Sequence, residues 1–153
     1  MYWRRRIFGF IGSVLAFDIL AAGVATHFVL SELSKLGVEI AFQTRLSTTL
    51  YDIIGMAPTL TPIFGIGLLI AFAVTSLIIR KLPAAQNRPS LAYAIAGFAS
   101  VMTALLAMEA VFGLWPIPAA RALSGLLALG ACGAIAGYIY ARFGHQQIPN
   151  QIN

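Results

Sequence analysis

The sequence predicts an all-α integral membrane protein, a bundle of four transmembrane helices in a single domain spanning residues 1–153. Three observations predict this class. The chain is 59% hydrophobic and only 10% charged, whereas about a quarter of the residues of a soluble domain are charged. Four apolar stretches are long enough to cross a bilayer, and the basic residues gather at their ends. Such a chain cannot cover itself with polar surface in water, so we expect it in a membrane.

The four apolar stretches cover residues 8–30, 62–79, 91–113 and 122–143. Each has about 18 to 23 residues, which as a helix is long enough to cross a hydrocarbon core about 30 Å thick. The β-branched residues and glycines in these stretches would disfavour a helix in water. In lipid, however, each segment must satisfy its own backbone hydrogen bonds, so we expect four helices.

The orientation of the spans follows from the positions of Lys and Arg. One side of the predicted membrane carries seven basic residues and no acid: Arg4, Arg5, Arg6, Arg80, Lys81, Arg88 and Arg142. The other side carries three basic residues, together with acidic ones: Lys35, Arg45 and Arg121, with Glu32, Glu39 and Asp52. Basic residues are enriched in cytoplasmic connections. We therefore predict that both termini are cytoplasmic (N-in/C-in), in a multi-pass protein of the bacterial inner (cytoplasmic) membrane.

The connection between the first two spans, residues 31–61, is long for so small a protein. Apolar residues recur in it at helical spacing, as at Leu33, Leu36 and Ile40, with polar residues between them. Pro58 and Pro62 are expected to end any helix before the second span. We predict an extracytoplasmic amphipathic segment of one or two interfacial helices, which serves either as a connector or as a lid.

Small residues recur every four positions in the third and fourth predicted helices. They are Ala92, Ala96, Ser100 and Ala104 in the third, and Gly133 and Gly137 in the fourth. This spacing lets two helix backbones approach closely, which is one way in which spans associate in lipid. Because the connection between these helices is short, we predict a tight antiparallel hairpin. The same stripe could instead face a second copy of the chain.

Ionisable side chains are rare within the predicted spans, and each is a candidate for function because a charge in lipid is costly. Three are present: Asp18, His27 and Glu109. At about 1.5 Å per residue, Asp18 lies about 15 Å along its span, near the middle of the bilayer. His27 and Glu109 share a depth near the outer interface, away from Asp18. We expect Glu109 to reach water there, or to pair with His27 or Arg121.

Asp18 has two interpretations. As a structural residue, it is uncharged and donates a hydrogen bond to a neighbouring helix, because no basic residue lies near it in depth. Thr75 and Thr103 lie nearest to it in depth and are its candidate partners. As a functional residue, it is an intramembrane site for a proton or a cation.

The sequence carries no signature of a catalytic, cofactor-binding or metal-binding site, and we predict none. Zinc requires three or four clustered His, Cys or carboxylate ligands, and the chain has two His and one Cys. The single Cys132 excludes a disulfide framework and a CxxC redox pair. Basic residues at helix ends explain the net charge of +5, so we expect membrane lipids as partners and no nucleic acid.

Three classes of function remain open. The first is a non-enzymatic accessory, assembly or structural subunit that binds lipid or other membrane proteins, alone as a homo-oligomer or in a larger membrane complex. The second is a small proton- or cation-coupled transporter or channel that acts as an oligomer, with Asp18 as its intramembrane site. The third is a membrane enzyme acting on a lipid or a quinone, which lacks a convincing acid–base pair. The small-residue stripes and the scarcity of buried polar groups favour the first class.

Overall fold

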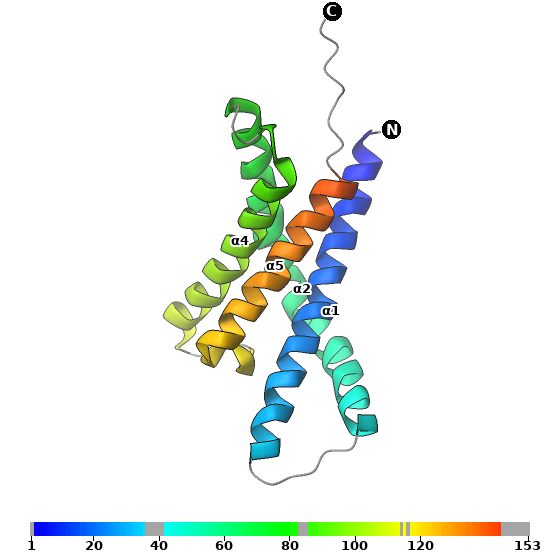
Figure 1. The fold of residues 1–153 in the computed structure, drawn as a ribbon, viewed down its shortest axis with the longest axis vertical. Coiled ribbons are helices and arrows are strands. Elements are labelled where there is room, and N and C mark those ends of the chain that lie inside the picture. Colours follow the sequence, from blue (N-terminus) through cyan, green and yellow to red (C-terminus); the bar gives the residue numbers. More distant parts are fainter. Residues whose placement is uncertain (1, 36–41, 83–85, 114, 116, 145–153) are drawn as a thin grey trace, which may run out of the picture.

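The computed structural model describes residues 2–35, 42–82, 86–113, 115 and 117–144. Four α-helices account for most of them: α1 (Tyr2–Lys35), α2 (Phe42–Lys81), α4 (Pro89–Phe112) and α5 (Leu123–Phe143). A short 3₁₀-helix, η1 (Pro118–Arg121), lies between α4 and α5. Figure 1 shows that α1 begins and α5 ends at the same end of the bundle.

The helices form a closed ring in the order α1, α2, α4, α5. Each packs against its two neighbours in this ring, and the interface between α4 and α5 is the most extensive. Successive helices run in opposite directions (Figure 1). The end at which α1 begins and α5 ends is called the terminal end below, and the end that carries η1 is called the η1 end.

Four helical segments of the described chain are long and apolar enough to cross a membrane. They are Arg4–Phe28, Thr61–Lys81, Pro89–Val111 and Leu123–Phe143. Their bounds lie within a few residues of those predicted from hydropathy, and the predicted all-α chain with four candidate spans is confirmed. These features are those of a multi-pass membrane protein.

The outer surface of the bundle is apolar, as a surface covered by lipid would be. Large side chains on every helix are well exposed, for example Leu15 at 54%, Ile66 at 62%, Ile95 at 60% and Leu127 at 48%. Soluble monomers rarely expose contiguous apolar patches of more than a few hundred Å². A bilayer removes the cost of this exposure because lipid chains replace water around these side chains.

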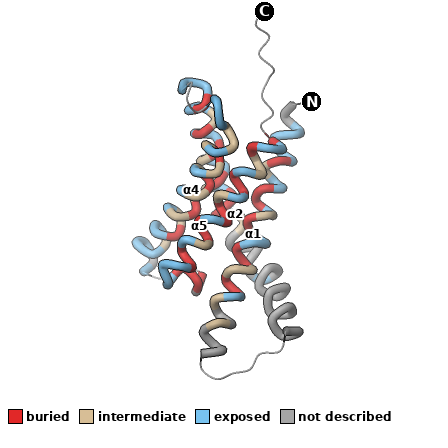
Figure 2. Tube along the Cα trace, in the orientation of Figure 1, coloured by how far each residue is buried: buried red, intermediate tan, exposed pale blue. Residues whose placement is uncertain are grey.

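Figure 2 shows that buried residues recur along every helix of the ring. Most of them are apolar or aromatic, and three of the described ones are polar: Ser13, Thr26 and Thr75. Every helix contributes to this core, with Phe17 from α1, Leu68 from α2, Leu105 from α4 and Leu129 from α5 all at most 1% exposed. No buried side-chain nitrogen or oxygen among the described residues lacks a hydrogen-bond partner. A protein interior within a membrane requires such pairing, because no water is present there to bond to a polar group that lacks a partner.

Helices α4 and α5 touch through their backbones. A Cβ atom built on Gly97 of α4 would lie 2.9 Å from the carbonyl carbon of Gly133, and one on Gly137 would lie 3.1 Å from Ala94 Cα. A Cβ on Gly130 would lie 2.6 Å from the Phe98 ring. Only glycine fits at these three positions without moving a neighbour, so these glycines set the distance between the two helices.

Four aromatic rings, one from each helix, join the bundle toward its terminal end. The ring of Phe72 stacks on Tyr140 at 4.5 Å and meets Phe10 and Tyr93 edge-on at 6.4 and 5.8 Å. Tyr93 and Tyr140 are also edge-on, at 5.2 Å. Edge-on and offset contacts are the favourable geometries for aromatic pairs. We call Phe10, Phe72, Tyr93 and Tyr140 the aromatic cluster.

The η1 end of the bundle is closed by the chain between α4 and α5. Ile117, Ala119 and Ala120 are 1–2% exposed, and η1 packs against both α1 and α5. A Cβ on Gly125 of α5 would lie 2.8 Å from the carbonyl carbon of Ala119. The short turn is therefore part of the packed structure rather than a loop standing free of it.

Helix α2 corrects one expectation from the sequence. Residues 31–35 belong to α1 and residues 42–61 belong to α2, so the predicted end of a helix at Pro58 and Pro62 is wrong. The first turns of α2 and the last turns of α1 extend beyond the α4–α5 turn (Figure 1). Transmembrane helices tolerate proline because neighbouring helices and local adjustments satisfy the freed carbonyl groups. The apolar side chains predicted to face the interface, such as Leu33 and Leu36, lie outside the described side chains.

Candidate functional site

Asp18 of α1 is hydrogen bonded to Thr61 of α2. The Thr61 hydroxyl donates to Asp18 Oδ2 over 2.6 Å. Asp18 lies near the middle of the part of α1 that could cross a membrane, and Thr61 is the first residue of the corresponding part of α2. An intramembrane carboxyl group bonded to a neighbouring helix is the arrangement in which such residues are usually found.

This partner differs from the candidates that depth alone suggested. Thr75 donates its hydroxyl to the backbone carbonyl of Ala71 in its own helix, at 2.7 Å. Thr103 is exposed on α4, which is not a neighbour of α1 in the ring. Counting residues from the span ends assumes helices that run straight and parallel, and the choice of Thr75 and Thr103 rested on that assumption.

The aromatic pair beside Asp18 fixes its position against α2. Phe17, the preceding residue, packs against Phe64 with ring centroids 5.0 Å apart, and both side chains are 1% exposed. Thr61 lies one turn before Phe64 on α2. Because large buried rings hold the two helices in one register, the Thr61 hydroxyl is held within reach of the carboxyl group.

The Asp18–Thr61 pair lies at the edge of the bundle. Asp18 and Thr61 are both half-buried, while the fully buried residues nearby are apolar. Thr61 lines an open apolar groove of about 320 Å³ between α1 and α2, which Val14, Leu15 and Gly65 also line. The carboxyl group is therefore placed beside a surface that lipid or another protein can reach.

The chemistry available to Asp18 is limited by its surroundings. Its one described partner is a neutral hydroxyl, and the structure does not bring His27 or Glu109 to it. A neutral donor can stabilise a carboxylate but cannot exchange a proton with it as a second titratable group would. The pair is suited to a polar contact with another helix, or to a single protonation step.

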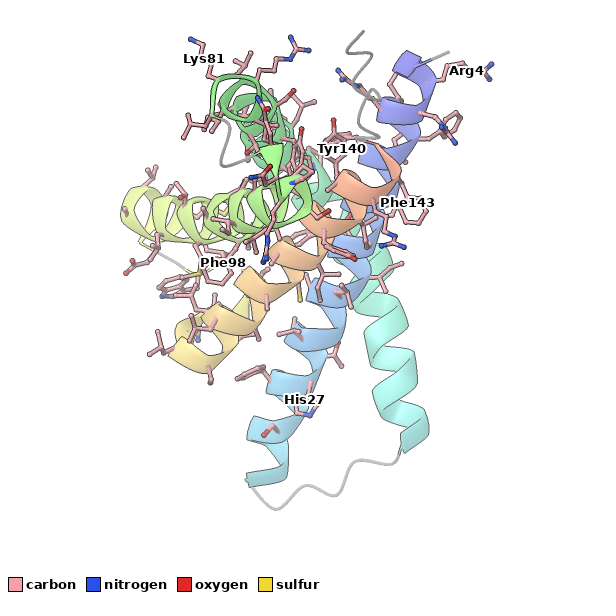
Figure 3. The ribbon with its side chains drawn as sticks, turned by 45° about the horizontal axis from the view of Figure 1, so that its top comes forward. Arg4, His27, Lys81, Phe98, Tyr140 and Phe143 are labelled. Carbon is pink, nitrogen blue, oxygen red and sulfur yellow. The ribbon has the colours of Figure 1, made fainter. Side chains whose placement is uncertain are left out.

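His27 and Glu109 are placed apart from Asp18 and are both exposed. Figure 3 shows His27 far from Arg4 and Lys81, which lie toward the terminal end. The ring of His27 contacts that of Phe28, the next residue, edge-on at 6.4 Å. In the described part of the chain, Glu109 forms no ion pair with His27 or Arg121. Glu109 is exposed near the end of its candidate span, and its contact with water stays a prediction.

The small-residue stripe of α4 lies beside α2. Ala92, Ala96, Ser100 and Ala104 are half-buried and line a second groove, between α2 and α4. The residues of α4 closest to α5 belong to a neighbouring stripe that contains Tyr93 and Gly97. Gly133 and Gly137 of α5 lie directly against this second stripe. The two sets of small residues therefore do not face one another.

The described residues contain no group of three or more His, Cys, Asp or Glu that could hold a metal ion. Cys132 is a buried free thiol on α5. It belongs to the cluster of buried apolar side chains that forms the core. Its surroundings are those of a packing residue, since reactive thiols occupy electropositive and partly exposed positions.

Sequence reasoning missed one feature of the site and one of the bundle around it. Thr61 was not named, although a threonine beside a proline at the start of a span is a visible signal of a polar position. The aromatic cluster was also missed, because its members are spread over four helices and their meeting depends on how those helices cross. Phe72 and Tyr93 lie within apolar stretches where an aromatic residue carries no special signal.

Comparison with known proteins gives no assignment. No protein-family model, curated protein or solved structure matches this chain.

Proposed function

We propose that this chain is a non-enzymatic accessory or assembly subunit of the bacterial inner membrane, with both termini in the cytoplasm. It acts by binding lipid or other membrane proteins through its outer surface. The observation that carries the proposal is the contrast between an apolar described core and an ionisable residue at its edge. The described core is mainly apolar, with Ser13, Thr26 and Thr75 as its buried polar side chains, whereas the Asp18 carboxyl group lies beside a groove lined by its partner Thr61 and offers a contact.

Asp18 supplies the specific contact in this proposal. An intramembrane carboxyl group is expensive to place in lipid and is usually paired with a polar or cationic group. Thr61 engages one carboxyl oxygen, and Asp18 is half-buried beside an open groove. A polar side chain from a helix of another protein, or of a second copy, would complete the pairing.

Site-specific photocrosslinking tests this role. A photoreactive residue at Leu15, which is 54% exposed and lines the α1–α2 groove, should capture a discrete partner in intact membranes. The same group at Leu127, 48% exposed on α5, is the matched control. Asp18→Leu should abolish capture from position 15, and Asp18→Asn, which keeps a polar group, should retain it. Equal capture from both positions, or capture that ignores Asp18, would refute a role for this contact.

The proposed orientation has its own test. Reporter fusions after Gln86 and at the C-terminus should report the cytoplasm, and fusions near Thr48 should report the periplasm. Seven basic residues at the terminal end of the bundle, against three elsewhere, support this orientation through the positive-inside rule. A periplasmic C-terminus would overturn both the orientation and the number of spans.

A proton- or cation-coupled transporter is the second candidate. The half-buried carboxyl group of Asp18 favours it, because such residues mark ion pathways in membrane proteins. Transport through this chain would need an oligomer, in which the path runs between copies. Asp18→Asn separates the two candidates, since it preserves a polar contact but cannot take up and release a proton.

A further inference from the structure

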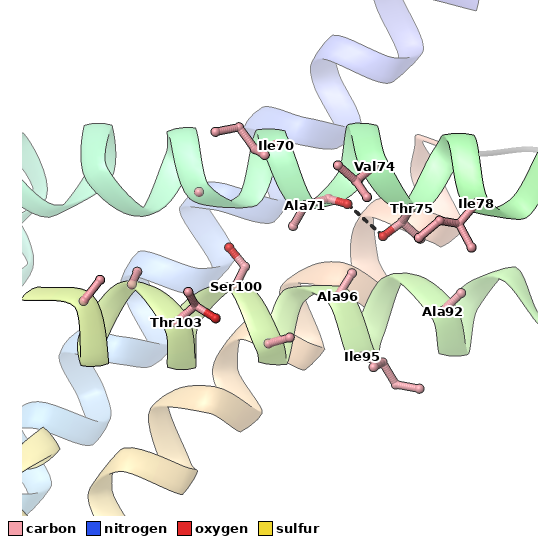
Figure 4. Close-up of a pocket in the computed structure, with 14 residues that line it drawn as sticks. Ile70, Ala71, Val74, Thr75, Ile78, Ala92, Ile95, Ala96, Ser100 and Thr103 are labelled. Atoms are coloured by element: carbon pink, nitrogen blue, oxygen red, sulfur yellow. Dashed lines mark hydrogen bonds between the residues drawn. The ribbon is translucent and has the colours of Figure 1, made fainter.

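A groove lies between α2 and α4 on the described outer surface, and it is larger than the α1–α2 groove. It has a volume of about 660 Å³ and is open along one side. Figure 4 shows its two walls, with Ala71, Val74 and Ile78 on α2 facing Ala92 and Ala96 on α4. Its concave shape arises because its walls consist mainly of small side chains.

The groove has the dimensions of a lipid chain. Along α4 it runs from Ala92 to Ala107, which at about 1.5 Å per residue is about 22 Å. One leaflet of a hydrocarbon core about 30 Å thick is about 15 Å deep, so an acyl chain can lie in the groove over its whole depth. The two helices approach closely at Ser100, where a Cβ on Gly67 would lie 3.2 Å from Ser100 Oγ.

One end of the groove is strongly basic. Arg80 and Lys81 follow the lining residue Ile78 on α2, and Arg88 precedes the first lining residue of α4. All three basic residues are exposed. The sequence between Asp52 and Glu109 contains no acidic residue. The segments of α2 and α4 that form this end of the groove therefore contribute no carboxylate of their own.

We propose that this groove binds an anionic phospholipid, with one acyl chain between α2 and α4 and the phosphate head group on Arg80, Lys81 and Arg88. The apolar walls match an acyl chain, and the basic end matches a phosphate head group. The two follow one another along the groove as the chain and the head group of a lipid do within one leaflet. Basic clusters directly beside a span are typical of anionic-lipid binding. This proposal goes beyond the proposed function, because it assigns a lipid class to a surface that does not include Asp18.

A second copy of the chain is a poorer occupant of the same groove. Copies inserted in the same orientation place their terminal ends in the same leaflet. A helix of the second copy in the groove would then bring its own basic residues close to Arg80, Lys81 and Arg88. Like charges in this setting repel one another, whereas an anionic head group is attracted.

Native mass spectrometry of the purified full chain tests the proposal. The protein in mild detergent is titrated with dioleoylphosphatidylglycerol and, separately, with dioleoylphosphatidylcholine, which has the same chains but no net charge. We expect one phosphatidylglycerol to be retained at concentrations at which phosphatidylcholine is lost. Equal retention of the two lipids would overturn the proposal, because the basic end would then contribute nothing.

Two pairs of variants locate the site. Arg80→Gln with Arg88→Gln should weaken phosphatidylglycerol binding about 25-fold, since each surface cation contributes roughly fivefold. Arg4→Gln with Arg142→Gln removes the same charge from exposed positions of the same end and should leave binding unchanged. Ala96→Phe fills the groove and should also abolish binding, whereas Ala73→Phe, at an exposed position of α2 outside the groove, should not.

The melting temperature of each variant, measured in the same detergent, separates a lost site from a lost fold. Binding that survives Ala96→Phe in a folded protein would refute the placement of the chain in the groove. An equal loss in both double Arg variants would refute a localised head-group site in favour of general charge attraction. A wild-type dimer that Ala96→Phe converts to a monomer would assign the groove to a second copy.

None of these outcomes bears on Asp18, so the failure of this proposal and that of the proposed function remain distinguishable.

Discussion

The α4–α5 pair and the α1–α2 pair are held together in different ways. Between α4 and α5, Gly97, Gly133 and Gly137 bring the two backbones into contact. Between α1 and α2, bulkier groups meet: Phe17 packs on Phe64 and Asp18 accepts a hydrogen bond from Thr61. Lipid offers no hydrophobic force to bring helices together, so each pair must rely on packing or on polar bonds.

The two pairs therefore differ in what sets the distance between their helices. Between α4 and α5, backbone contact through glycine tolerates no added atom. Between α1 and α2, the size of the buried side chains sets the distance. The polar residue with a candidate function, Asp18, belongs to the α1–α2 pair, and the glycines that define the other pair have no evident chemistry.

Gly137→Leu should have the largest effect on stability. Its side chain would meet the backbone of Tyr93 and Ala94, which no rotamer change can avoid, so α4 and α5 must separate. We expect a loss of about 3 kcal/mol or more in the free energy of unfolding, measured as a lower melting temperature in detergent. Gly12→Leu is the control, because a Cβ at Gly12 meets nothing within 4 Å. Equal melting of the two variants would show that α4 and α5 are not in backbone contact.

Phe72→Ala should rank second. It removes the ring that contacts Phe10, Tyr93 and Tyr140 and leaves a cavity where all four helices meet. We expect a loss of about 2 kcal/mol in the free energy of unfolding, measured in detergent. Most of this loss comes from the cavity and the lost contacts, because lipid is as apolar as the core. The control is Phe8→Ala, at a residue that is 66% exposed. A Phe72→Ala protein as stable as the control would show that the aromatic cluster does not join the helices.

The Asp18–Thr61 hydrogen bond should contribute less. Interhelical bonds of this kind contribute about 0.6 kcal/mol on average and up to about 1.7 kcal/mol. A double-mutant cycle with Asp18→Leu and Thr61→Val should give a coupling free energy within this range, measured by unfolding in detergent. Asp18→Asn should keep most of the stability, because the amide can still bond to Thr61. A coupling free energy of zero would mean that the two side chains do not interact in the folded protein.

Ala96→Leu should have the smallest effect. Ala96 is half-buried and faces the open α2–α4 groove, so a larger side chain can extend into space that lipid otherwise fills. We expect the free energy of unfolding in detergent to change by less than about 0.5 kcal/mol, as for a tolerated surface substitution. A loss as large as that of Gly137→Leu would place Ala96 in a tight interface and would remove the distinction between the two stripes of α4.

Much of the fold could be predicted from the sequence, because the summed hydropathy of about 20 consecutive residues is enough to recognise a membrane span. The four spans required only a count of apolar residues, and the glycine spacing at Gly133 and Gly137 marks a helix face that can approach another closely. The sequence does not indicate which face of α4 packs against α5. The face that contains Ala92 and the face that contains Gly97 both carry small residues and look equally suitable for a close contact. The choice depends on how the helices cross, which no local pattern records.

The same limit explains the partner of Asp18. Its importance was visible, because an acid in the middle of an apolar stretch is rare. The role of Thr61 was not visible in the sequence. Any helix before the second span was expected to end at Pro58 and Pro62, so a residue between these prolines was not counted as part of a span. The rule that proline ends a helix holds best in water, and neighbouring helices relax it in a membrane.

The central claim is that the bundle functions through its surface and conducts nothing through Asp18. Proton flux in proteoliposomes tests this claim most directly, with a pH-sensitive dye inside the vesicles and a potassium diffusion potential as the driving force. The account predicts that wild type and Asp18→Asn both give the flux of protein-free vesicles. A wild-type flux that Asp18→Asn abolishes, at an unchanged melting temperature, would contradict the account and make Asp18 a transport site.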